Sequence, residues 1–182
     1  GVGFAFMRER MDDRIHGSAQ LVAAVGAPVL AVVPKVSGWR KRTQTRLVTT
    51  SASGSPAAEA YRSLRTNLQF ISRDASMRVI AVTSPQAGEG KTTTVANLAT
   101  TLALTGKRVV ALSADLRKPR LHRFFGQANE DGLSSILAGQ VQVADVARRV
   151  EGLDSLRVVT SGPVPPNPAE LLSSDEMELL LE

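Results

Sequence analysis

The sequence predicts an α/β fold in which helices cover both faces of a parallel sheet. Apolar runs of strand length at residues 79–82, 107–113 and 156–160 alternate with segments of helical periodicity. A loop of small residues, TSPQAGEGKTTT, joins the first run to a helix that Gly106 ends. Ligands of such sheets gather at the carboxyl ends of the strands, so we expect a site where this loop and Asp115 lie.

The N-terminal part of the chain predicts smaller elements. We expect a helix over residues 8–16 and a short helix over 18–25 that Gly26 closes. The run PVLAVVP predicts a strand stopped by Pro34. Residues 37–54 are rich in Ser, Thr, Gly and Arg without an apolar period, which predicts a linker.

The next helix is predicted to begin at Ser55, a good N-cap, with Pro56 at the first helical position. Its apolar residues form one narrow stripe: Tyr61, Leu64, Leu68 and Ile71. Three charged residues with the spacing E-x-x-R-x-x-R project from a neighbouring face: Glu59, Arg62 and Arg65. By themselves they predict only a local ion pair of about 0.3–0.5 kcal/mol.

Beyond the second strand, residues 133–139 and 141–150 predict two short helices. A last helix is predicted after Asn167, which would cap it. Pro168 would take its first position and Glu170 its third, a variant of the capping box.

The loop before the second long helix has the residue types that hold a nucleotide phosphate. Small residues let successive backbone N–H groups turn inward, and with the helix N-terminus they form a cavity for oxyanions. Lys91 can reach the outer phosphates, and the Thr92 hydroxyl can join the shell of a bound Mg²⁺. The residues expected to bind nucleotide are Gly88, Glu89, Gly90, Lys91, Thr92 and Thr93. With the flanking strand and helix, this interpretation is preferred to an ordinary strand–turn–helix.

Composition excludes several other classes. The chain of 182 residues is 43% hydrophobic, which indicates a globular domain, and it has no cysteine for disulfides or thiolate metal sites. The histidines His16 and His122 fit no metal-ligand spacing. A basic stripe with aromatic residues for stacking is not evident, so nucleic acid is not an expected partner.

The positive charge is concentrated at the N-terminus. Residues 1–50 have eight basic and three acidic residues, a net charge of +5, whereas residues 51–182 are balanced. Charge alone is equally compatible with a solvated linker and with a segment attracted to anionic lipids. The apolar opening GVGFAFM runs directly into Arg8, an arrangement typical of the cytoplasmic end of a membrane span.

The phosphate loop departs from the common pattern G-x-x-x-x-G-K-[ST], because Pro85 takes the first glycine position. Gln86 stands where the partitioning ATPases have lysine. Ser-Pro-x-x-Gly-Glu-Gly-Lys-Thr instead resembles the Walker A loop of the bacterial tyrosine kinases, which are attached to, or fused with, polysaccharide co-polymerases. The segments GLSSILAG and SGPVPPNPAELLSSDEM are also similar to this family. So is the E-x-x-R-x-x-R helix, through which these kinases pack into a ring.

The family's Walker A′ motif is an apolar run followed by D-x-D-x-R. Asp115 and Arg117 match the second aspartate and the arginine, but Ser113 replaces the first aspartate. The resemblance implies that Asp115 helps to hold Mg²⁺, while a purely structural alternative is that it caps the turn before Arg117. Serine lacks the charge and basicity of a carboxylate, so the match supports nucleotide binding better than phosphoryl transfer.

The resemblance implies a non-specific protein-tyrosine autokinase that depends on ATP and Mg²⁺ and regulates the biosynthesis and chain length of capsular and exopolysaccharides. Lys91 and Asp115 would be its catalytic residues. Its expected partners are neighbouring kinase subunits in a ring-like homo-oligomer, the membrane co-polymerase segment and the anionic surface of the bacterial inner membrane, at the cytoplasmic face. Two alternatives stay open: a non-catalytic ATP-binding regulator, which Ser113 favours, and a partitioning-type ATPase.

The same resemblance divides the chain into three parts. Residues 1–36 would be the juxtamembrane end of the co-polymerase domain, 37–54 a linker, and 55–182 part of a kinase domain of the P-loop NTPase type. In the family, a Walker B aspartate and a C-terminal tyrosine cluster follow the last helix. We therefore expect residues 1–182 alone to be inactive.

Overall fold

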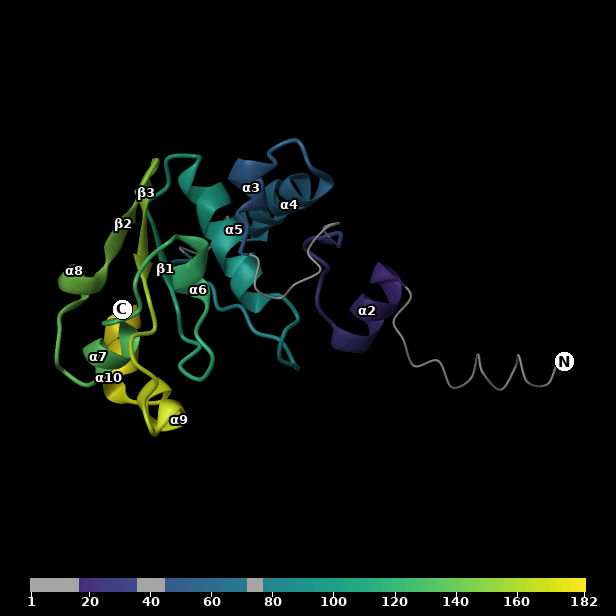
Figure 1. Cartoon of the computed structure of the whole chain (residues 1–182). Helices are drawn as coiled ribbons and strands as arrows, with labels where there is room; N and C mark the ends of the chain where they lie inside the picture. The colour runs from purple at the N-terminus through teal and green to yellow at the C-terminus, as the bar shows by residue number, and fades with distance from the viewer. Residues whose placement is uncertain (1–16, 36–44, 72–76) are drawn as a thin grey trace, which may run out of the picture.

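Among the residues that the structure describes, three strands form a sheet: β1 (Val109–Leu112), β2 (Arg148–Val150) and β3 (Leu153–Val159). In the computed structural model their order is β1–β3–β2, with β1 parallel and β2 antiparallel to β3. The predicted α/β fold is confirmed, with a mixed sheet in place of a wholly parallel one (Figure 1).

The structure describes residues 17–35, 45–71 and 77–182. The helix predicted over 8–16 lies outside these residues, as does the first part of the predicted linker.

Strand β2 replaces the second half of a predicted helix. Helix α8 ends early (Val143–Val146), and the chain then extends into β2 instead of continuing the helix to residue 150. Gly152 has a φ of 73°, a left-handed conformation that glycine adopts without strain, and it closes the turn into β3. The β2–β3 hairpin satisfies backbone hydrogen bonds that a short isolated helix would leave at its ends.

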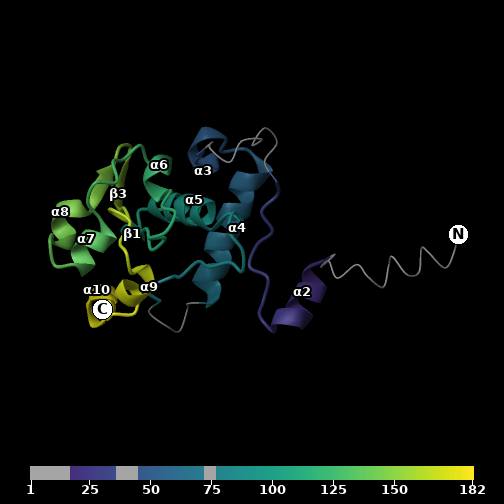
Figure 2. The ribbon, with the colours of Figure 1, turned by 60° about the horizontal axis from the view of Figure 1, so that its bottom comes forward.

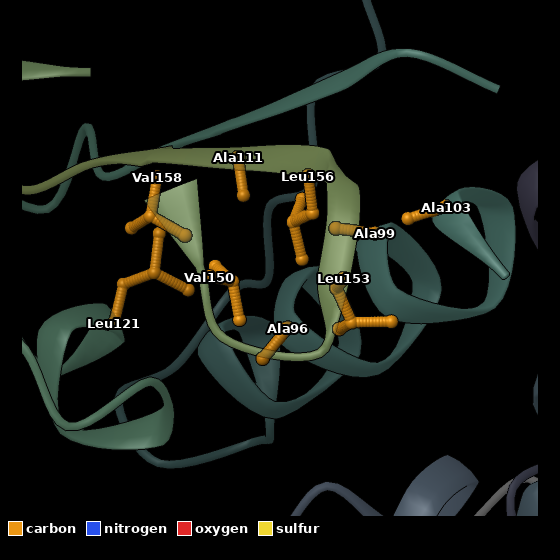
Figure 3. Close-up of a cluster of buried hydrophobic side chains, with 9 residues drawn as sticks. All are labelled: Ala96, Ala99, Ala103, Ala111, Leu121, Val150, Leu153, Leu156 and Val158. Carbon is orange, nitrogen blue, oxygen red and sulfur yellow. The ribbon is translucent and has the colours of Figure 1, made fainter. Parts of the chain in front are cut away.

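Helix α5 (Lys91–Ala103) lies between the sheet on one side and α3 and α4 on the other, as both views show (Figures 1 and 2). On the sheet side its small residues Ala96, Ala99 and Ala103 face the apolar side chains of the strands (Figure 3). Leu156 and Val158 are fully buried there. Because alanine side chains are small, α5 approaches the sheet closely. Lys91, the first residue of α5 after the phosphate loop, therefore belongs to a helix that is anchored to the core.

Helix α4 (Pro56–Ile71) begins as predicted, because the Ser55 Oγ accepts a hydrogen bond of 3.2 Å from the Ala58 N–H. Tyr61 on the predicted apolar stripe is buried. The stripe is less buried toward the end of the helix, where Ile71 is 54% exposed.

A further short helix, α3 (Val48–Ser51), lies inside the predicted linker. Val48 is buried against Ala57 and Tyr61, and Thr49 is buried beside Asn97 of α5. The predicted linker, residues 37–54, thus contains a short packed helix that the absence of an apolar period did not indicate, and its role as a boundary between domains stays a prediction. Two adjacent apolar residues in this Ser/Thr-rich stretch dock the helix: Leu47 packs against the main core and Val48 against α4.

Two predicted strands do not form. Residues after α2 (Ser18–Val25) are extended but unpaired, and Val32 is 72% exposed. Residues 79–82 also lie outside the sheet, with Val79 and Ile80 49% and 42% exposed. A strand needs a neighbour for its backbone groups, and within the described residues β1 pairs with β3 alone.

The C-terminal helices lie at the end of the sheet where β1 and β3 finish, on the side away from α3 and α4 (Figures 1 and 2). They are α7 (Leu133–Leu137), α9 (Pro168–Leu172) and α10 (Asp175–Leu181). Leu171, Leu172, Met177 and Leu180 pack against the buried side chains of Leu116, Leu133 and Leu137.

The single last helix that the sequence predicts is divided into α9 and α10, because Ser174 starts a new helix. The predicted capping box at Asn167 is wrong as well. Its side-chain Nδ2 donates to the Glu170 Oε2 at 2.7 Å, and neither side chain caps a backbone group of the helix.

Candidate nucleotide-binding site

The loop before α5 has a backbone that depends on glycine. Gly88 and Gly90 have φ angles of 87° and 96°, in the left-handed region where a side chain would be strained. Gly90 is also the N-cap of α5, and its carbonyl accepts the Thr94 N–H at 2.8 Å. The predicted nucleotide-binding residues therefore lie together, in the loop and first turn of a helix that is packed on the core.

Lys91 folds back onto its own loop. Its Nζ donates to the Ser84 Oγ at 3.1 Å and, more weakly, to the Gln86 carbonyl at 3.5 Å. Ser84 itself donates to the Gln86 carbonyl at 2.8 Å, and the Glu89 carboxylate accepts the Gln86 N–H at 3.2 Å. Among the described residues, no carboxylate lies within 4.0 Å of the Lys91 ammonium. An anionic ligand would supply the missing opposite charge.

Asp115 follows β1 and holds the turn that comes after it. Its Oδ1 accepts the backbone N–H of Arg117 at 3.3 Å and of Lys118 at 2.9 Å, which is the structural alternative proposed from the sequence. Only one carboxylate oxygen is used in this way, and the side chain is exposed. Within the described part of the chain, no hydrogen bond or ion pair joins Asp115 to Lys91.

Ser113 lies in the last position that continues the β1 ladder, where its N–H donates to the Val159 carbonyl at 2.9 Å. Its exposed fraction is only 6%. An aspartate in this position would place a carboxylate in a nearly buried environment beside the sheet edge.

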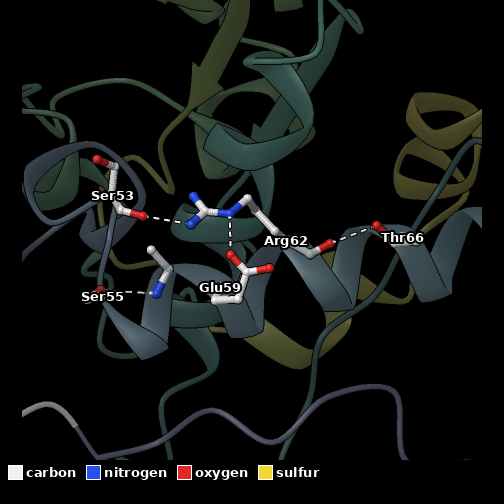
Figure 4. Close-up of polar contacts among 6 residues, drawn as sticks. Ser53, Ser55, Glu59, Arg62 and Thr66 are labelled. Atoms are coloured by element: carbon white, nitrogen blue, oxygen red, sulfur yellow. Dashed lines mark hydrogen bonds and ion pairs between the residues drawn. The ribbon is translucent and has the colours of Figure 1, made fainter.

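The charged residues of α4 differ from one another in their contacts. The Arg62 Nε donates to the Glu59 Oε2 at 2.8 Å, and its Nη2 donates to the Ser53 carbonyl at 2.7 Å (Figure 4). The Arg65 Nε is buried and has no hydrogen-bond partner among the described residues. The local ion pair of Glu59 and Arg62 is thus formed, while a subunit contact through these three residues stays a prediction.

Asn97 is a connecting residue that the sequence analysis did not single out. It is fully buried on α5, its Oδ1 accepts from the N–H and hydroxyl of Thr49 at 3.4 Å, and its Nδ2 donates to the Thr93 carbonyl at 2.9 Å. A second donation reaches the Arg46 carbonyl at 3.4 Å. An amide within an apolar helical stripe was the available signal, because a buried amide needs partners.

Residues 80–174 match the CbiA family, the CobQ/CobB/MinD/ParA nucleotide binding domain. The structure resembles the kinase domain of Escherichia coli tyrosine kinase ETK with a TM-score of 0.82 at 33% identity, over 92% of this chain and 68% of that one. The chain belongs to the bacterial tyrosine kinases. Relatives of this chain include Tyrosine-protein kinase YwqD of Bacillus subtilis (strain 168), 44% identical over 139 residues, and Tyrosine-protein kinase ptk of Acinetobacter johnsonii, 34% identical over 189 residues.

These alignments cover 76% and 100% of this chain. They span only 58% of the Bacillus relative and 26% of the Acinetobacter relative. The family and the nucleotide-binding fold predicted from the sequence are confirmed. The roles of individual site residues stay predictions.

Proposed function

We propose that this chain forms the nucleotide-binding part of an ATP-dependent protein-tyrosine autokinase that regulates capsular or exopolysaccharide biosynthesis and chain length. The observation that carries the proposal is Lys91, a half-buried cation without a carboxylate partner among the described residues, at the end of a loop held by two left-handed glycines. Membership of the tyrosine kinase family supplies the reaction class.

The residues present fit MgATP. The N–H groups from Gly88 to Thr92 and the positive end of α5 would hold the phosphates, and Lys91 would exchange its neutral partners for phosphate oxygens. The Thr92 hydroxyl and the unused oxygen of Asp115 would contribute to a Mg²⁺ shell. Within the described residues, no cluster of three acidic or histidine side chains offers a separate metal site. Bound Mg²⁺ would neutralise charge that develops on the transferred phosphoryl group.

A non-catalytic ATP-binding regulator is the second candidate, and Ser113 favours it. This side chain is nearly buried and cannot serve as a base for the tyrosine hydroxyl. In that case nucleotide binding would control assembly without phosphoryl transfer.

The surroundings of the site follow from the same proposal. Residues 1–36 would form the juxtamembrane end of a co-polymerase segment at the cytoplasmic face of the inner membrane, and 55–182 would belong to the kinase domain. Glu59, Arg62 and Arg65 would contact neighbouring kinase subunits. Within the described residues, no helix has both the length and the apolar composition to cross a membrane.

Calorimetry with MgATP, on this chain extended with the C-terminal part of the ETK kinase domain, tests the nucleotide site directly. Lys91→Ala removes the mobile charge aimed at the outer phosphates and leaves the backbone cradle, so we expect at least tenfold weaker binding with an unchanged melting temperature. Lys107→Ala, which removes an exposed charge beyond the other end of β1, is the matched control. Equal affinities of the Lys91→Ala and control proteins would exclude the phosphate role of Lys91.

The reaction class needs a second experiment, on a chimera that extends this chain with the C-terminal part of the ETK kinase domain. Incubation with γ-labelled ATP separates the candidates. Phosphotyrosine supports the kinase, nucleotide binding without turnover supports the regulator, and release of free phosphate alone supports a partitioning-type ATPase.

A further inference from the structure

A basic hollow of about 520 Å³ lies beside the turn that Asp115 holds. It opens between that turn and the short helix α6 (Leu121–Phe124). The residues that line it are Lys118, Pro119, Arg120, His122, Arg123 and Asn129. No acidic side chain is among them.

Two basic residues of this hollow lack an acidic partner among the described residues. The chain from Arg117 to Arg123 contains four basic residues and no acidic one. Among the described residues, no carboxylate lies within 4.0 Å of Lys118 or Arg123. A concave surface with charge of a single sign concentrates the electrostatic potential and attracts anions.

The two neutral polar residues of the hollow play different parts. The Asn129 side chain is satisfied internally, since its Nδ2 donates to the Gly162 carbonyl at 2.7 Å and its Oδ1 accepts the Gly162 N–H at 3.2 Å. It therefore shapes the wall. The His122 Nδ1 is buried and has no hydrogen-bond partner among the described residues. Burial, and next the charge of Arg123, lower the pKa of His122, which keeps the ring neutral near pH 7.

The position of the hollow relates it to the proposed phosphoryl transfer. Lys118 lines the hollow, and its backbone N–H donates to the Asp115 Oδ1 at 2.9 Å. A ligand held by Lys118 would therefore lie within one turn of the carboxylate assigned to the metal shell. A peptide suits this position, because its acidic side chains can occupy the hollow while its tyrosine extends toward the nucleotide site.

Other anionic ligands fit the lining less well. Single-stranded nucleic acid is held by aromatic side chains on which bases stack, and the lining has neither Phe, Tyr nor Trp. A membrane surface would also require exposed apolar residues at the rim, and the lining offers only Pro119.

We propose that this hollow binds an acidic segment of the peptide substrate, so that carboxylates or phosphates flanking the target tyrosine contact Lys118 and Arg123. The inference rests on the proposed kinase function and adds the substrate class: tyrosines in anionic sequence surroundings.

The test uses the 182-residue chain and a labelled peptide with one tyrosine between glutamates, with binding followed by fluorescence anisotropy. A peptide with glutamine at each glutamate is the matched ligand. The variant Lys118→Gln/Arg123→Gln removes two charges from the hollow, and Lys107→Gln/Arg108→Gln removes two exposed charges before β1. We expect the hollow variant to bind the acidic peptide about tenfold or more weakly, and the control variant to bind as the parent chain does.

Four results would overturn the proposal. The first two are equal binding of the glutamate and glutamine peptides, and an equal loss of peptide binding in the control variant. The third is unchanged peptide binding by a hollow variant of unaltered melting temperature. The fourth is a hollow variant that loses binding of RNA or anionic vesicles but keeps its binding of the peptide. A phosphotyrosine peptide that binds more tightly than the acidic one, and only to an intact hollow, would support it and identify phosphate as the stronger ligand. MgATP calorimetry on the chain extended with the C-terminal part of the ETK kinase domain separates the two questions. Peptide binding by the 182-residue chain without nucleotide binding by the extended chain would refute the proposed function and leave the hollow as a docking site.

Discussion

At the scale of single residues, Asp115 and Lys91 show why site chemistry is harder to predict than a motif. Their positions followed from the sequence, because a glycine loop before a helix and a polar residue after a strand are local patterns. The partners of Lys91 did not, whereas the turn that Asp115 caps was one of the two alternatives for that residue. Asp115 uses one oxygen to hold its own turn, and Lys91 pairs with Ser84, seven residues earlier in the chain. Such contacts depend on side-chain conformations that spacing does not encode.

Ser113→Asp tests whether the chain comes from a weakened kinase. In the chimera extended with the ETK segment, we expect more autophosphorylation, since a positioned base contributes about 10²–10⁴-fold. Position 113 is nearly buried, so the same change should lower the melting temperature of the 182-residue chain through desolvation of the carboxylate. Ser113→Asn, equal in shape but uncharged, is the control. If the aspartate protein binds MgATP and gains no activity over the asparagine protein, the regulator becomes the better candidate.

Tyr61 should make the stability of the chain sensitive to alkaline pH. Burial raises the pKa of Tyr61 above its ordinary value of 10.0, and a hydrogen bond with Thr94 acts in the opposite direction. Above pH 10 the unfolded chain loses this proton more readily than the folded chain, so the free energy of unfolding falls as pH rises toward the folded-state pKa. Urea denaturation at pH 8 and pH 10.5 should show a smaller decline for Tyr61→Phe than for the parent chain. An identical decline would assign the effect to other groups.

At the scale of elements, prediction succeeded where the signal is local. Helices α4 and α5 followed from a capping serine, a glycine loop and a 3.6-residue apolar period, and β1 and β3 from short β-branched runs. Residues 79–82 have an equally apolar run and form no strand, because pairing depends on a neighbour elsewhere in the chain. Residues 148–150 were predicted as helix because their structure also depends on a pairing partner. That partner is β3, and the periodicity of three residues does not reveal a strand pairing.

The charged face of α4 should matter more for assembly than for folding. Alanine at Glu59, Arg62 and Arg65 together removes one exposed ion pair and the exposed hydrogen bond from Arg62 to the Ser53 carbonyl, each of which contributes about 1 kcal/mol or less to stability. If these residues contact other subunits, the triple variant of the ETK chimera should shift toward monomer in light scattering at a nearly unchanged melting temperature. Alanine at Glu170, Arg148 and Arg149, which lie away from α4, provides a control of equal charge change. An oligomer of unaltered size would leave only the local ion pair.

At the scale of the whole molecule, exposed apolar backbone segments set the behaviour of the chain in solution. Met77, Val79 and Ile80 are 40%, 49% and 42% exposed, in an extended segment outside the sheet. Extended apolar segments with free backbone groups promote association between chains. We expect residues 1–182 to aggregate or to bind MgATP weakly, and to form no phosphotyrosine.

Extension of the chain with the C-terminal part of the ETK kinase domain should restore solubility and nucleotide binding. Size-exclusion chromatography and calorimetry of both proteins provide the measurement. The double change Val79→Thr/Ile80→Thr is a control, since it should reduce aggregation without restoring phosphotyrosine. Strong tyrosine phosphorylation by the 182-residue chain itself would contradict this expectation.

The closed loop around Lys91 makes nucleotide binding a competition between an internal ligand and an external one. The Ser84 hydroxyl and the Gln86 carbonyl occupy the ammonium that a phosphate would take, so the loop must release its own lysine before the nucleotide is held. The apparent affinity is then the intrinsic affinity multiplied by the fraction of molecules whose lysine is free. Under the proposed phosphate role of Lys91, the strength of the hydrogen bond between Ser84 and the lysine would set the affinity for ATP.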